Sequence, residues 1–285
     1  DEAAYNALVD VAKSVPGCTL LDAQTDGNHN RCVFTLVGSP EAIEEVAFQL
    51  TKKAAEVIDM TKHKGEHSRM GATDVIPLVP TMGVTVEECV EITKRLGQRI
   101  WDELKIPSFL YEDSATRPER RNLATCRKGQ FEGMPEKLLQ PEWAPDFGER
   151  KIHPTAGITA IGARMPLVAF NVNLATDVNI AKKIAKVIRA SSGGFRSCKA
   201  MGFMLEDRGI AQVSMNMVNY EDTPLYVVYE MIRALAERYG TYIVDSEIVG
   251  LTPAKAMIDC AEFYLKAKDF DCHNQVMEYH LIGLE

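Results

Sequence analysis

The sequence has 285 residues, of which 46% are hydrophobic and 25% are charged, and its formal net charge is −8. This composition is typical of a folded globular protein and excludes disordered, collagenous and coiled-coil chains. Because a negatively charged chain is repelled by phosphate, we expect no nucleic-acid partner and no anionic membrane as a partner.

The sequence also indicates in which cellular compartment the protein is located. No stretch approaches the roughly 18 consecutive apolar residues that a membrane span needs. The start Asp1-Glu2-Ala3-Ala4 has neither the basic residues nor the apolar run of a signal peptide. The seven cysteines are odd in number and scattered, which is typical of reduced thiols. We therefore expect a cytoplasmic protein.

The first half predicts an alternation of helices and strands. In chain order, the hydrophobic spacing predicts a helix at 2–14, strands at 19–23 and 32–37, a helix at 39–58, a strand at 74–78, a helix at 85–104 and a strand at 108–111. Ser39 before Pro40 predicts one helix start, and the capping box Thr85-x-x-Glu88 predicts another. Residues 113–157 contain only short helical pieces, and a connection of this length is usually functional.

The second half predicts a complete supersecondary unit. Its elements are a strand at 166–173, a helix at 177–189, strands at 199–206 and 211–219, a helix at 224–238, a strand at 242–249 and a helix at 253–267. This βαββαβ order predicts a ferredoxin-like unit. The first half fits the same plan if one strand precedes residue 1, so we expect that first strand to be missing from the sequence. The fold class is therefore α/β, with subdomains at 1–165 and 166–285.

The segment Asp59–Gly71 holds the densest set of reactive side chains. Its His63-x-x-Glu66-His67 pattern matches an inverted zincin, in which two histidines bind zinc and the glutamate activates water. Such ligands need a helix, which Gly65 disfavours. An exposed loop without a role is a second alternative. We prefer a third, in which one histidine is a general base, because its ordinary pKa lies near working pH.

Two further segments combine groups that bind ligands. Residues 143–157 contain apolar surface, the cations Arg150 and Lys151, and glycines that allow a close approach to a ligand. The hairpin loop near Asp26 contains Arg31, which suits a carboxylate ligand. Each has an ordinary alternative: the first as a connector, the second as a hairpin loop rich in Asn and Asp.

The chain resembles the glutamate formimidoyltransferase family in three segments: Asp59-Met60-Thr61-Lys62-His63-Lys64-Gly65-Glu66-His67-Ser68-Arg69-Met70-Gly71, Trp143-Ala144-Pro145-Asp146-Phe147-Gly148 and Gly250-Leu251-Thr252-Pro253-Ala254-Lys255-Ala256. The similarity covers nearly the whole chain and is to the short monofunctional bacterial form. It implies formiminotransferase N- and C-terminal subdomains whose sheets line a ligand tunnel. It also implies a homodimer that transfers a formimino group from N-formimino-L-glutamate to N5 of tetrahydrofolate in histidine degradation.

The resemblance also implies roles for particular residues. In the family the histidine that ends the Lys-Gly-Glu-His motif is catalytic, which assigns that role to His67, with Glu66 or Asp26 beside it. We expect Arg31 and Arg69 to bind substrate carboxylates. The folate-binding segment of the family corresponds to Gly148, Glu149, Arg150, Lys151, Ile152, His153, Pro154, Thr155, Ala156 and Gly157.

The sequence departs from the family at two positions near these residues. Ser68 stands where the family usually has proline, and Gln24 stands where the animal enzymes have an acidic residue, so Asp26 is the expected carboxylate. Tetrahydrofolate is expected as co-substrate, with no metal. The alternatives are a zinc hydrolase, formyl exchange between 5-formyltetrahydrofolate and glutamate, and a folate-binding protein without catalysis.

Overall fold

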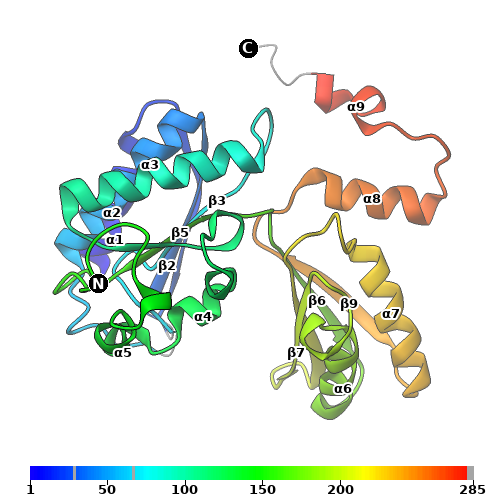
Figure 1. Cartoon of the computed structure of the whole chain (residues 1–285). Coiled ribbons are helices and arrows are strands. Elements are labelled where there is room, and N and C mark those ends of the chain that lie inside the picture. The colour runs from blue at the N-terminus through cyan, green and yellow to red at the C-terminus, as the bar shows by residue number, and fades with distance from the viewer. Residues whose placement is uncertain (28–29, 66–67, 281–285) are drawn as a thin grey trace. The chain divides into compact units, whose positions relative to one another are not determined.

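The computed structural model describes residues 1–27, 30–65 and 68–280. The chain divides into two compact units, Asp1–Arg164 and Met165–Glu285 (Figure 1). Each unit has its own hydrophobic core, as expected for segments of this length.

The first unit begins with a helix, a hairpin and a second helix. These elements are α1 (Glu2–Ser14), β1 (Cys18–Asp26), β2 (Arg31–Gly38) and α2 (Pro40–Val57). β1 and β2 pair antiparallel, with Asp26 opposite Arg31 at the turn end of the hairpin. The hydroxyl of Ser39 accepts from the amide of Ala42 at 3.3 Å and caps α2, as the sequence predicts.

A three-stranded parallel sheet forms the centre of the first unit. Its strands are β3 (Val75–Leu78), β4 (Ser108–Leu110) and β5 (Thr159–Ala163), in the order β3-β5-β4. The predicted capping box is present, because Thr85 and Glu88 cap α3 (Val86–Leu104) reciprocally. α3 packs its buried side chains, including Leu96, against Ile161 on one face of the sheet. The strand β5 was not predicted: all five of its residues are buried, so the alternation that marks a half-buried strand is absent.

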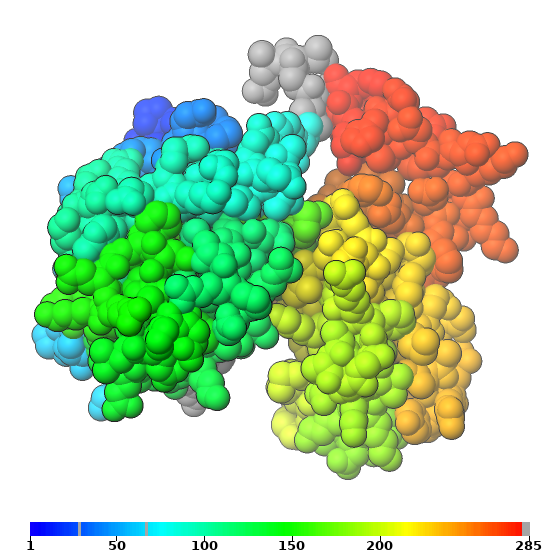
Figure 2. Space-filling view, viewed as in Figure 1, coloured from blue at the N-terminus to red at the C-terminus, as the bar shows by residue number. Residues whose placement is uncertain are grey.

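The long connection between β4 and β5 packs against the other face of the same sheet. Its helices are α4 (Leu123–Arg127) and α5 (Gln130–Lys137), with short 3-10 helices η1 (Glu112–Ser114), η2 (Pro118–Arg120) and η3 (Pro141–Trp143). Cys126, Met134 and Trp143 from this connection are buried in one cluster with Phe109 of β4. Figure 2 shows the outer side of this connection, drawn in green, over one face of the first unit. The connection is therefore an ordered layer.

The second unit is a four-stranded antiparallel sheet covered by helices. Its strands are β6 (Val168–Leu174), β7 (Cys198–Leu205), β8 (Ile210–Met217) and β9 (Ile243–Val249), in the order β7-β8-β6-β9. This is the ferredoxin-like strand order. α6 (Val178–Ile188) and α7 (Leu225–Arg238) pack on one face, where Val172, Ile184 and Val228 share the core. The remaining helices are η4 (Ala190–Ser192), α8 (Ala254–Leu265), α9 (Cys272–Gln275) and η5 (Met277–His280).

The predicted α/β class with ferredoxin-like units is confirmed. The second unit carries the complete βαββαβ order, and the first carries the predicted helix, hairpin, helix and strand. The predicted tunnel is a relation between the two units and stays a prediction. Among the described residues, no helix has both the length and the apolar character required to span a membrane.

Candidate functional site

The segment that follows α2 is a loop tied down at its beginning. The carboxylate of Asp59 accepts hydrogen bonds from the amide and the hydroxyl of Thr61, at 3.0 and 2.6 Å, and lies 3.0 Å from the ammonium of Lys62. These hydrogen bonds lower the pKa of Asp59. Met60, between them, is buried. The first turn of the loop is therefore fixed by its own side chains.

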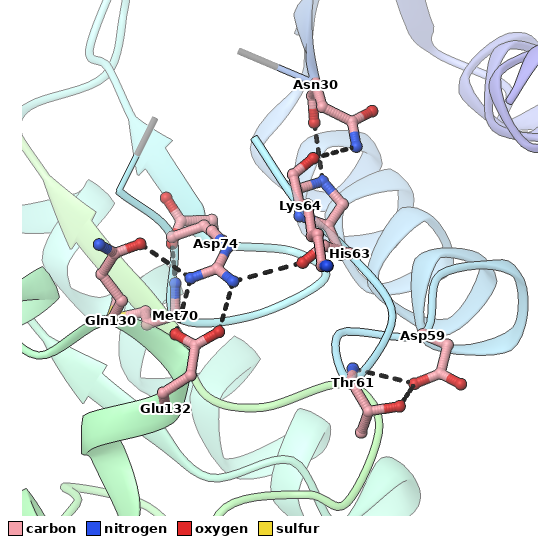
Figure 3. A network of polar contacts seen from close by, with 10 residues as sticks. Asn30, Asp59, Thr61, His63, Lys64, Met70, Asp74, Gln130 and Glu132 are labelled. Atoms are coloured by element: carbon pink, nitrogen blue, oxygen red, sulfur yellow. Dashed lines mark hydrogen bonds and ion pairs between the residues drawn. The ribbon is translucent and has the colours of Figure 1, made fainter. Parts of the chain in front are cut away.

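Asn30 links the β1–β2 hairpin to this loop. Its carbonyl oxygen lies 2.8 Å from Nε2 of His63, and its side-chain amide donates to the carbonyl of Lys64 at 2.7 Å (Figure 3). Because a carbonyl only accepts, Nε2 of His63 carries the proton in this contact. Asn30 adopts a left-handed conformation, with φ 48°, which asparagine tolerates better than most residues. The tip of the hairpin therefore lies against His63 and Lys64 of the 59–71 segment, which we call the histidine-bearing loop.

The turn end of the same hairpin also carries two of the predicted site residues. A guanidinium nitrogen of Arg31 lies 3.9 Å from the carboxylate of Asp26. A cavity of about 390 Å³ opens beside them. It is lined by Gln24, Thr25, Asp26, Gly27, Arg31 and Val33. The structure thus brings Asp26 and Arg31 together at a hollow, close to the loop that Asn30 holds.

Arg69 lies in the same loop, two residues after His67 in the sequence. Its Nη1 and Nη2 nitrogens donate to the two carboxylate oxygens of Glu132 at 2.8 and 2.6 Å. This pairing raises the pKa of Arg69 and lowers that of Glu132. Arg69, predicted to bind a substrate carboxylate, therefore binds a carboxylate of its own chain. Figure 3 shows Glu132 and Gln130 pointing toward one guanidinium group.

Asp74 and the last residue of α4, Arg127, support the end of the loop. The carboxylate of Asp74 accepts from the amide of Met70 at 2.8 Å and from Nε of Arg127 at 2.7 Å. A second cavity, of about 400 Å³, opens next to these contacts. It is lined by Ser68, Ala124, Thr125, Arg127, Lys128, Gly129 and Gln130. The hydroxyls and cations of this lining suit an anionic ligand.

Three backbone hydrogen bonds join the loop to the predicted folate-binding segment. The amide of Met60 donates to the carbonyl of Thr155 at 2.8 Å, and the amide of Ala72 donates to the carbonyl of Ala156 at 2.9 Å. The amide of Ile158 donates to the carbonyl of Met70 at 3.1 Å. The two segments that the sequence singled out independently therefore lie side by side.

Both glycines that bound the 148–157 segment are required by close packing. Gly148 has φ 102° and Gly157 has φ 72°, and a Cβ on Gly157 would lie 2.3 Å from the carbonyl oxygen of Met70. Between them, the side chains of Glu149, Arg150 and Lys151 are exposed. The segment is anchored at its ends and presents charged groups to solvent between them.

His153 occupies the turn at the end of this segment. Its Nδ1 accepts from the amides of Ala156 and Thr155, at 3.0 and 3.4 Å. Accepting through Nδ1 requires the neutral ring, and burial lowers the pKa of His153 accordingly. Ile152 and Pro154 flank the turn. His153 therefore shapes the backbone of the segment.

The predicted catalytic pair and the zinc alternative fall partly outside the residues that the structure describes. Glu66 and His67 lie outside the described residues. His63, the third member of the zincin pattern, lies in a non-helical stretch, whereas that pattern needs a helix. Within residues 1–27, 30–65 and 68–280, no group of three or more His, Cys, Asp or Glu side chains could hold a metal ion.

The sequence did not predict three residues that shape this site. Asn30, Gln130 and Glu132 contact the histidine-bearing loop from elements that are distant in the chain. The one sequence signal for Gln130 and Glu132 was the length of the connection at 113–157, which predicted function without naming residues. Asn30 was indicated only as a member of the hairpin loop near Asp26.

Comparisons with known proteins assign both units to one family. A model of the formiminotransferase domain, N-terminal subdomain, matches residues 1–164, and a model of the formiminotransferase domain matches residues 169–282. The chain is 64% identical to a glutamate formimidoyltransferase of Streptococcus pyogenes over 284 residues, 99% of this chain and 95% of the relative. It is 45% identical to a glutamate formimidoyltransferase of Thermoplasma acidophilum, over 95% of this chain and 90% of that protein.

A longer relative matches over part of its length. The chain is 45% identical to a formimidoyltransferase-cyclodeaminase of Gallus gallus over 266 residues, which are 91% of this chain and 49% of the relative. The similarity to monofunctional relatives thus extends over nearly their whole length, as the sequence predicted. The chain belongs to the formiminotransferase family.

Proposed function

We propose that this chain is a transferase that moves the formimino group of N-formimino-L-glutamate to N5 of tetrahydrofolate and releases L-glutamate, a step of histidine degradation. The names and coverage of the relatives support this activity. The observation that carries it is the pairing of the histidine-bearing loop with the 148–157 segment through Met60 and Thr155. This pairing suits a reaction that needs a general base beside a bound folate.

The chemistry requires one group that both takes and gives a proton. N5 of tetrahydrofolate forms a bond to the formimino carbon, and the bond from that carbon to the glutamate nitrogen then breaks. We propose that His67 accepts the proton from N5 and returns a proton to the departing nitrogen, so that atoms and charge balance. A histidine suits this work because its pKa lies near neutrality. Glu66 or Asp26 would orient the ring.

The carboxylates of both substrates need cations. Arg31 lies at the cavity beside Asp26, and Arg150 and Lys151 are exposed on the segment that pairs with the loop. Arginine binds carboxylates in a bidentate way, so we propose Arg31 for N-formimino-L-glutamate. We propose that residues 148–157 bind tetrahydrofolate. Because the net charge is −8, these cations act locally.

The remaining parts of the proposal concern the environment of the enzyme. We propose a cytoplasmic homodimer that works without a metal and without nucleic acid or membrane partners. Transfer from an amidine carbon needs proton transfer and proximity, which protein side chains supply. Light scattering at several concentrations tests the dimer.

One assay tests the proposed function. The purified protein is incubated with tetrahydrofolate and N-formimino-L-glutamate, and glutamate release is followed with and without a chelator. We expect release that depends on folate and does not respond to the chelator. Loss of release with the chelator would support the zinc hydrolase instead, and no release with folate still bound would indicate a folate-binding protein. Replacing the substrate by 5-formyltetrahydrofolate and glutamate tests formyl exchange.

A further inference from the structure

The start of α5 holds Arg69 through both its side chain and its backbone. The guanidinium donates to Oε1 of Gln130 at 2.8 Å and bidentately to Glu132, and the carbonyl of Arg69 accepts from the amide of Phe131 at 2.9 Å. The side chain of Arg69 is only 12% exposed, whereas that of Glu132 is 64% exposed. A charged pair that is half shielded from water is held more firmly than a surface pair.

The same guanidinium reaches across the loop. Its Nη2 nitrogen donates to the carbonyl oxygen of His63 at 3.3 Å, and that carbonyl lies six residues earlier in the chain (Figure 3). The segment between them carries Glu66 and His67 in its sequence. On the leading side, Asn30 holds His63 and Lys64. Both ends of the segment are therefore tied to structure outside it.

All the terminal N–H groups of the Arg69 guanidinium already donate to acceptors of this chain, so none is left for a ligand. Nη1 donates to Gln130 and Glu132, and Nη2 donates to Glu132 and His63, which accounts for all four terminal N–H groups. The remaining donor, Nε, is buried without a partner among the described residues. A substrate carboxylate would have to displace Glu132 to reach this guanidinium.

We infer that Arg69, held by Glu132, is a positioning residue that joins the described parts of the loop before and after residues 66 and 67, and that it does not bind a substrate carboxylate. The inference rests on the proposed function, because it assumes that His67 acts on the substrates. Positioning is valuable because a displacement of about 1 Å at a reacting group can cost about a hundredfold in rate.

The substitution Glu132→Gln separates the two roles of Arg69, because they predict opposite results. If Arg69 positions the segment, loss of the carboxylate lowers kcat by about 10- to 100-fold and leaves KM for N-formimino-L-glutamate within about twofold of wild type. If Arg69 instead binds substrate, Glu132→Gln releases the guanidinium, so that kcat is retained and KM stays the same or falls. That second result would overturn the inference.

A double-mutant cycle and a matched control complete the test. Because Arg69 and Glu132 act as one unit, Arg69→Gln combined with Glu132→Gln should lower kcat no further than Arg69→Gln alone. The conservative Glu132→Asp should recover part of the kcat lost in Glu132→Gln. The control Glu45→Gln breaks the ion pair with Arg99, at 2.6 Å, between α2 and α3, and should leave kcat unchanged.

Thermal unfolding followed by circular dichroism distinguishes positioning from loss of fold. All assays are run well below the melting temperature of each variant. A fall in kcat that follows only the unfolded fraction, or additive losses in the double mutant, would contradict the inference. A wild-type protein that releases no glutamate would instead defeat the proposed function itself, so the two failures are distinct.

Discussion

The amide nitrogen of Met60 donates a hydrogen bond to the carbonyl oxygen of Thr155 across 2.8 Å. This contact joins the loop that leads to His67 to the segment proposed to bind folate. It is made by backbone atoms, as are the two neighbouring hydrogen bonds that the amides of Ala72 and Ile158 donate. The pairing of the two segments is therefore insensitive to most side-chain changes and sensitive to changes that move the backbone.

Gly157→Ala is the substitution that tests this pairing most directly. The backbone at Gly157 has φ 72°, and an added Cβ would lie 2.3 Å from the carbonyl oxygen of Met70. The left-handed conformation and the overpacking together should cost about 2–5 kcal/mol in the free energy of unfolding of the first unit. Urea denaturation monitors that loss.

Gly193→Ala provides the matched control. Gly193 also has a positive φ, of 88°, but nothing lies within 4 Å of an added Cβ. Its substitution should therefore cost only about 1–2 kcal/mol, from conformation alone, in the second unit. Equal losses in the two variants would show that the approach of Met70 to Gly157 is not the constraint described.

The elements with local signals were predictable from the sequence. The reciprocal caps of Thr85 and Glu88 marked the start of α3, and the polar and apolar alternation marked β1 and β2. β5 gave no such signal, because Thr159–Ala163 is buried on both faces. Its position between β3 and β4 depends on tertiary pairing, which a single sequence does not encode locally.

The sequence predicted which types of residue form the site. It did not predict which of these residues contact one another. The sequence indicated Arg69 as a cation suited to carboxylates, and a carboxylate does bind it. That carboxylate belongs to Glu132, 63 residues later, and no periodicity or spacing connects the two positions. Asn30 was likewise predicted only as part of a hairpin loop, whereas the structure has it holding His63 and Lys64.

His153 should make the stability of the first unit depend on pH. Burial lowers the pKa of His153 below its ordinary value of 6.5, so the unfolded chain binds a proton more readily than the folded chain. The free energy of unfolding should therefore fall as the pH drops below about 6.5. His153→Asn retains an acceptor but cannot titrate, so its urea midpoint should fall less between pH 7 and pH 5.

The control for this prediction lies in the other unit. His273→Asn changes a histidine of α9 and should leave the pH dependence of the first unit as in wild type. An unchanged pH dependence in His153→Asn would contradict the role assigned to the neutral ring.

The cysteines should fall into two reactivity classes. Cys89, Cys126 and Cys198 are buried, and burial raises the pKa of Cys126 and Cys198 to about 11. Because the thiolate is the reactive form, these thiols should react slowly with a disulfide reagent at pH 8. The partly exposed thiols, which should react faster, are Cys18, Cys32, Cys260 and Cys272.

Mass spectrometry after brief labelling checks this assignment. Denaturant should make all seven cysteines reactive, because the sequence contains seven and none is paired. Rapid labelling of Cys126 in the native protein would contradict the packing described for the connection between β4 and β5.

The most direct test of the proposed chemistry is the turnover of His67→Ala, measured with tetrahydrofolate binding on the same preparation. Loss of the general acid and base should lower glutamate release by roughly 10²–10⁴-fold while folate binding is retained. His280→Ala, far along the chain in η5, should keep wild-type turnover. Wild-type turnover in His67→Ala would contradict the account.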